Sequence, residues 1–110
     1  MKNLVLELDY MSGPIIKDTF DIQSGELCTG IALIDEDGYL NALNEEIQEV
    51  YTGLYQFDEK EQAVSFDDVA AKNAKEWLLS KINELSGYLE SINDGSFNIE
   101  DRVTEYLKQL

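Results

Sequence analysis

Apolar and polar residues alternate over the first part of the chain. Every second residue from position 4 to position 10 is apolar, and a period of two predicts a half-buried strand over residues 3–11. Alternation resumes after a Ser-Gly-Pro turn and predicts a second strand over residues 15–22, antiparallel to the first. Residues 27–34, LCTGIALI, are apolar and β-branched enough to predict a third. The N-terminal third is therefore expected to form an antiparallel β-meander.

Helical periodicity follows. Apolar residues spaced three and four apart predict an amphipathic helix over residues 39–55: Leu40, Leu43, Ile47, Val50 and Leu54. A longer helix is predicted from an N-cap at Asp67 or Asp68 to about Asn93, and a short one over residues 100–109. Residues 63–66 are ambiguous and allow a short strand. The prediction is one α+β domain, residues 1–110, with the two main helices and the short C-terminal helix packed on one sheet face.

The charge of the chain narrows the classes of partner. Twenty-three Asp and Glu stand against 8 Lys and Arg, which gives −15, and there is no histidine. Such a chain has no basic face for nucleic acid or for an anionic membrane. Residues 35–68 hold 11 acids and only Lys60, a net charge of −10. Most of the charge therefore belongs to the first helix and the segments on either side of it.

This concentration of acids has two interpretations. A cationic partner would give it a use, because complementary charge speeds association and suppresses wrong partners. The alternative is a solvated face that only keeps the protein soluble, with Tyr55 and Phe57 packed against the sheet. On the first interpretation, the acids and the two aromatic residues among them are candidate partner-binding residues: Asp35, Glu36, Asp37, Glu45, Glu46, Glu49, Tyr55, Phe57, Asp58 and Glu59.

Catalytic and metal-binding patterns are weak. When Gly38 is placed at position 6 of a calcium loop, Leu33 and Asn44 occupy two positions that need a carboxylate. No glycine-rich phosphate loop occurs, and Asp9 and Asp18 lack room for a substrate cleft in so short a chain. We therefore expect no enzyme activity, no metal and no cofactor.

The chain start and the cysteine count indicate a compartment. MKNLVLELDY has acids within its apolar run, unlike a secretory signal, and no stretch approaches the roughly 20 apolar residues of a membrane span. Cys28, the single cysteine, cannot form an internal disulfide. We expect a cytoplasmic protein, and self-repulsion at −15 favours a monomer.

Two segments carry a resemblance to a family. LELDYMSGPIIKD (6–18) and INDGSF (92–97) resemble segments of small immunity proteins from bacterial contact-dependent growth-inhibition systems. The resemblance implies a protein that binds the C-terminal domain of a cognate toxin in a 1:1 complex and blocks its active site. Many such toxins are nucleases with basic clefts, in agreement with the charge of this chain. The resemblance marks no contact residues.

Two other functions stay open. An acidic DNA mimic would inhibit DNA-binding proteins such as restriction enzymes, and needs acids spaced along a long face like phosphates. A structural protein would need no special charge pattern, and its acidic face would be merely solvated.

Overall fold

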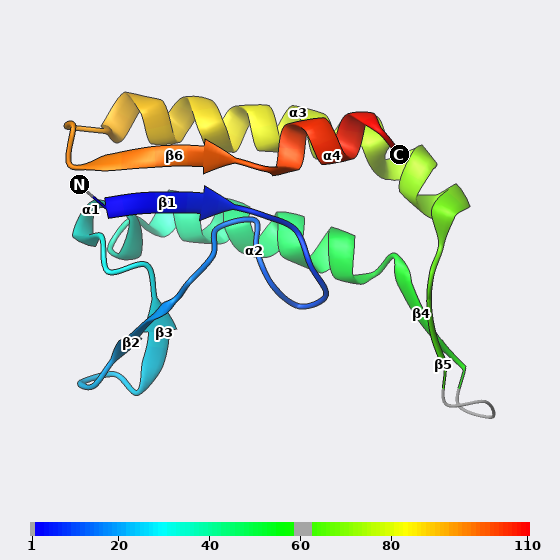
Figure 1. Ribbon diagram of the computed structural model, residues 1–110, viewed down its shortest axis with the longest axis horizontal. Coiled ribbons are helices and arrows are strands. Elements are labelled where there is room, and N and C mark those ends of the chain that lie inside the picture. The colour runs from blue at the N-terminus through cyan, green and yellow to red at the C-terminus, as the bar shows by residue number, and fades with distance from the viewer. Residues whose placement is uncertain (1, 59–62) are drawn as a thin grey trace.

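A strand near the start of the chain pairs in parallel with a strand near its end. The computed structural model describes residues 2–58 and 63–110, with the backbone alone at residues 57, 58, 63 and 64. Strand β1 (Lys2–Leu6) lies beside β6 (Phe97–Asp101), with Lys2 opposite Phe97. Helices α2 (Gly38–Thr52) and α3 (Asp68–Ile92) lie behind this pair, α2 behind β1 and α3 behind β6 (Figure 1).

The core fills the space between the strand pair and the two helices. Leu4, Leu6 and Phe97 of the strands are at most 2% exposed. The helices contribute the buried members of their predicted apolar stripes: Leu40, Leu43, Ile47, Leu78, Ile82, Leu85 and Leu89. Burial of such side chains contributes roughly 1.5–3 kcal/mol each, so this layer carries most of the stability of the fold.

The predicted antiparallel meander is matched only in part. Strand β1 has a parallel ladder with β6, and the returning chain meets β1 at a single antiparallel bridge between Leu6 and Ile15. The bridge is closed by the N–H groups of Glu7 and Ile16, and the N–H of Ile15, which faces away from β1, donates to Oδ1 of Asn44 on α2, at 2.8 Å. The second predicted strand is reduced to β2 (Thr19–Asp21), which pairs with β3 (Glu26–Cys28) in an antiparallel hairpin.

The third predicted strand, residues 27–34, is divided between two elements. Its start belongs to β3, and its end forms α1 (Ala32–Asp35). The chain turns between them because Asp35 accepts hydrogen bonds from the N–H groups of Thr29 and Gly30. Strand β3 therefore ends at Cys28. The last part of the predicted strand is a helical turn, because periodicity cannot distinguish a strand from a helix in so short an apolar run.

The two long helices confirm their predictions. Asp37 and Asp67 cap α2 and α3, their side chains accepting from the N–H groups of Leu40 and Ala70. Helix α2 ends at Thr52, before the predicted residue 55, because the chain then enters β4 (Tyr55–Asp58). Strand β4 pairs antiparallel with β5 (Ala63–Phe66), the segment that the sequence left open.

The C-terminal helix is shorter than predicted. Helix α4 (Val103–Lys108) follows β6 directly, because the start of the predicted range 100–109 belongs to the strand. Val103 and Leu107 of α4 are fully buried in the common core. The coarse prediction of an α+β fold is confirmed, although the strands among the described residues form three two-stranded sheets in place of one. None of the described helices is long and apolar enough to cross a lipid bilayer.

Candidate functional site

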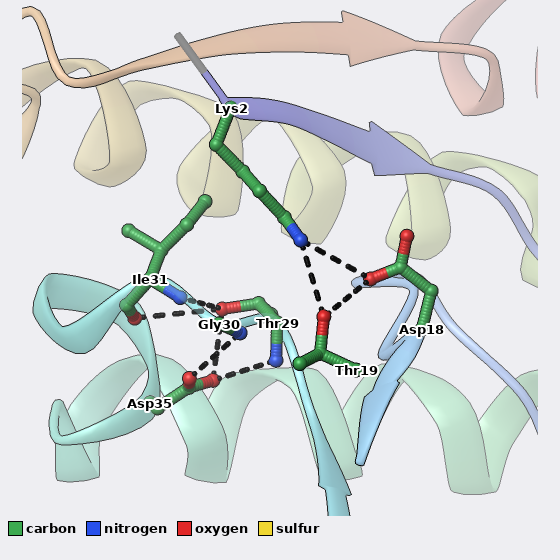
Figure 2. Close-up of polar contacts among 7 residues, drawn as sticks. All are labelled: Lys2, Asp18, Thr19, Thr29, Gly30, Ile31 and Asp35. Carbon is green, nitrogen blue, oxygen red and sulfur yellow. Dashed lines mark hydrogen bonds and ion pairs between the residues drawn. The ribbon is translucent and has the colours of Figure 1, made fainter. Parts of the chain in front are cut away.

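The β2–β3 hairpin projects from the body of the molecule (Figure 1). Lys2 of β1 fastens its base: the ammonium group donates to Oγ1 of Thr19 at 3.1 Å and pairs with the carboxylate of Asp18 at 3.6 Å (Figure 2). Exposed pairs of this kind are worth little by themselves. Their contribution here is to link β2 to the central strand pair.

Asp35 holds the second strand of the hairpin at its base, where β3 ends. One carboxylate oxygen accepts from the N–H and the hydroxyl of Thr29, at 2.9 and 2.8 Å, and the other accepts from the N–H of Gly30 at 3.1 Å (Figure 2). Thr29 is buried, so its polar groups need these partners. Hydrogen bonds to a charged acceptor are stronger than neutral ones, and Asp35 therefore fixes where β3 leaves the body.

A second segment, the loop of residues 9–14, lies against α2. The N–H of Met11 donates to Oγ1 of Thr52, and the carbonyl of Met11 accepts from Nε2 of Gln48, both at 3.1 Å. Met11 has a φ of +55° and a side chain that is 64% exposed. Gly13 has a φ of +81°, and a Cβ there would lie 1.8 Å from the carbonyl oxygen of Glu7. The loop therefore requires glycine at position 13, and it presents Met11 to solvent.

A groove runs along α2 between the hairpin and this loop. It consists of three adjoining hollows of about 320, 180 and 320 Å³. The first and second share Lys17 and Leu27 in their walls, and the second and third share Met11 and Gln48. We call this continuous surface the α2 groove.

The α2 groove is strongly acidic. Five carboxylates and one ammonium group line it: Asp21, Glu26, Asp35, Glu45, Glu49 and Lys17. In the part of the chain that the structure describes, no Lys or Arg lies within 4.0 Å of any of the five carboxylates. Adjacent Glu46, in contrast, pairs with Lys81 of α3 at 3.7 Å. Uncompensated charge is thus concentrated on the concave side of α2.

The structure brings three of the predicted binding residues together in this groove. Glu45 and Glu49 are four residues apart on α2, so they lie on one face of the helix, and both are exposed. Asp35 lies at the end of the groove, where it also holds the base of the hairpin. Glu36, which follows the last residue of α1, is exposed and does not line the groove.

Asp37 and Glu46 have other partners. Asp37 caps α2 and accepts a hydrogen bond of 2.5 Å from the Tyr88 hydroxyl, which lowers the pKa of its carboxyl group below the ordinary value of 3.8. Glu46 faces α3 through its pair with Lys81. These two carboxylates connect helices, and neither adds to the unpaired charge of the groove.

Of the two predicted aromatic residues, Tyr55 is the one whose side chain is described. Tyr55 is half-buried, with its ring 5.1 Å from those of Tyr10 and Phe66 and 5.8 Å from that of Tyr51. This environment favours the packing interpretation for Tyr55. The side chains of Phe57 and Asp58, and the whole of Glu59, lie outside the described residues.

Sequence reasoning missed the contribution of the hairpin and of the loop. Asp21 falls in the second predicted strand and Glu26 in the turn before the third, neither was included in the acidic site, and Leu27 and Met11 were not singled out. The sequence did contain one indication of this surface: acids and large apolar residues alternate on either side of the turn, in Phe20-Asp21-Ile22 and in Glu26-Leu27. What the sequence could not give is the position of this hairpin beside α2.

The groove is suited to binding a cationic surface. Among the described residues, no three His, Cys, Asp or Glu side chains are grouped so as to hold a metal ion. Comparison of the chain with protein-family models, with curated proteins and with solved structures gave no match. A function for the α2 groove therefore has to be inferred from its own charge, shape and exposed side chains.

Proposed function

We propose that this protein is a cytoplasmic immunity protein that binds and neutralises a basic toxin domain, with a nuclease as the expected toxin. The observation that carries the proposal is the α2 groove, where five carboxylates and one lysine meet and no carboxylate has a cation within 4.0 Å among the described residues. The nuclease class is chosen because a phosphate-binding cleft presents Lys and Arg. An acidic groove that covers such a cleft excludes the nucleic acid.

The energetics favour a charged partner. Two opposite unit charges 4 Å apart interact by about 1 kcal/mol in water and about 4 kcal/mol at the effective dielectric constant near a protein surface. Glu45 and Glu49 repel each other in the free protein, as do like charges at this spacing on any helix. Approach of a basic surface replaces that repulsion by attraction, and the long-range field also speeds encounter.

The groove favours a protein partner with mixed chemistry over DNA mimicry. Leu27 and Met11 line it and are 59% and 64% exposed. A surface that imitates phosphates does not require apolar side chains, whereas protein interfaces gain much of their affinity from them. We therefore place inhibition of a basic protein ahead of a general anti-restriction role.

The direct test is binding and protection. The candidate partner is the C-terminal domain encoded by the reading frame directly upstream of the gene for this chain, here called the toxin domain. We expect the two to copurify 1:1, and the chain to abolish the nuclease activity of the toxin domain. Absence of binding at nanomolar concentration and low salt, or binding without loss of activity, would refute the proposal.

A further inference from the structure

The β2–β3 hairpin exposes three large apolar side chains. Phe20 and Leu27 are directly opposite each other in the hairpin register and are 61% and 59% exposed. Ile22, at the turn, is 88% exposed. Cross-strand partners lie on the same face of a two-stranded sheet, so Phe20 and Leu27 form one apolar patch. Leu27 also lines the α2 groove, which makes the patch continuous with the acidic surface.

The free hairpin gains little from this arrangement. An isolated two-stranded hairpin is marginal in water, and an apolar face that stays exposed adds no burial. Asp21 and Glu26, the next cross-strand pair, place like charges opposite each other, which is unfavourable. Neither carboxylate has a Lys or Arg partner among the described residues. Because successive pairs lie on opposite faces of a two-stranded sheet, Phe20 and Leu27 are on one face and Asp21 and Glu26, which line the α2 groove, are on the other. A partner that straddles the hairpin would cover the apolar pair with a recess and offer cations to the acidic pair.

The base of the hairpin is fixed although its tip lies outside the core. Lys2 holds Asp18 and Thr19 where β2 begins, and Asp35 holds Thr29 and Gly30 where β3 ends (Figure 2). An element whose orientation is set before binding loses less conformational entropy when it docks. The hairpin is thus built to present its side chains at a fixed place beside the groove.

We propose that the patch of Phe20 and Leu27, with Ile22 at the turn, is the anchor by which this protein holds its partner. The occupant is a basic protein surface with an apolar recess for Phe20 and Leu27, and with Lys or Arg that would enter the α2 groove, where Asp21 and Glu26 lie on the other face of the hairpin. This rests on the proposed function and adds a division of roles: the carboxylates of α2 set the rate of association, and the hairpin sets the rate of dissociation. A second copy of the chain is a poor occupant because two chains of −15 repel each other.

The test compares hairpin variants with a matched surface variant. Phe20→Ser and Leu27→Ser, alone and together, remove the patch, and Val69→Ser removes an apolar side chain that is 71% exposed on α3. Because all three residues are exposed, we expect circular-dichroism melting curves close to that of the wild type. Dissociation from the immobilised toxin domain is then measured by surface plasmon resonance.

We expect the double variant to dissociate at least about 30-fold faster with little change in association rate, and Val69→Ser to stay within about 2-fold of the wild type. Normal dissociation of the folded double variant would overturn the anchor but leave the proposed function standing. A wild type that does not bind the toxin domain would overturn both. A wild-type dimer in sedimentation that the double variant converts to a monomer would also overturn the proposal, since the occupant would be a second copy.

Discussion

Reversal of two charges in the α2 groove gives the sharpest test of its electrostatic role. The groove holds five acids and one base, a net −4, and Glu45→Lys with Glu49→Lys leaves three of each, a net of zero. Neither glutamate has an ion-pair partner among the described residues, and both are exposed. Because a Lys pair replaces a Glu pair at the same spacing, the repulsion along the helix is kept, and we expect little change in stability.

The expected effect is on the rate of association. Electrostatic steering raises association rates by about 10- to 1,000-fold, and its range is the Debye length, about 30 Å at 0.01 M salt and about 3 Å at 1 M. We expect the double reversal to slow association with the toxin domain at least about 10-fold at 0.01 M, and the two rates to converge toward 1 M. Stopped-flow fluorescence over a salt series measures both.

The matched control separates local charge from total charge. Glu76→Lys with Glu90→Lys changes the net charge from −15 to −11, as the groove reversal does, at two exposed positions on α3. We expect this variant to associate within about 3-fold of the wild type, since the groove field is unchanged. Equal slowing by the two double variants would mean that only net charge matters, and no slowing by either would refute electrostatic steering altogether.

Three further predictions concern how the site is held. Gly13→Ala places a Cβ against the carbonyl oxygen of Glu7 at a positive φ, so we expect a loss of roughly 2–4 kcal/mol in unfolding free energy by urea titration. Asp35→Asn removes the charge that holds the end of β3, so we expect faster amide hydrogen exchange in β3 and a loss of about 1–2 kcal/mol, with exchange in α3 unchanged as the internal reference. Asp37→Asn keeps the cap but removes a carboxylate whose pKa the Tyr88 hydroxyl lowers in the folded state. The stabilisation by the charged Asp37 carboxylate is therefore present above the pKa of the unfolded state and lost as pH falls through the lower pKa of the folded state. The melting temperatures of variant and wild type should differ at pH 6 and converge below pH 3.8. A difference that stays constant with pH would contradict this coupling between ionisation and stability.

Local signals predicted the helices well. The spacing of Leu40, Leu43 and Ile47 fixed the buried face of α2, and Asp37 and Asp67 are residues with a strong N-cap preference. Both signals are contained within a few residues of the chain. They are therefore readable without knowledge of the rest of the fold.

Strand pairing was harder to predict than the helices, because alternation indicates which face of a strand is buried but not which strand lies beside it. The alternation around Leu4 and Leu6 is the same whether β1 pairs with the next segment or with β6, more than 90 residues away. The same limit explains Phe20 and Leu27, whose alternation suggests a buried face. Their hairpin leaves the body, so those side chains meet solvent.

The candidate site was predictable only where it depends on one helix. Glu45 and Glu49 share a face by their spacing, and the rotation of about 100° per residue separates them from Glu46. Asp21 and Glu26 enter the site through the placement of a hairpin, which no pattern on α2 specifies.

The distribution of ion pairs bears on whether the acidity is only a solvated face. Glu46 of α2 and Glu84 of α3 both lie within 4.0 Å of Lys81. The carboxylates of the groove lack such partners within the described residues, and they lie beside exposed Leu27 and Met11. Unpaired carboxylates by themselves also occur on α3, at exposed Glu76 and Glu90 among the described residues. A solvated face does not explain why exposed apolar side chains lie beside such carboxylates at one concave surface. A partner that is both basic and apolar accounts for the two features together.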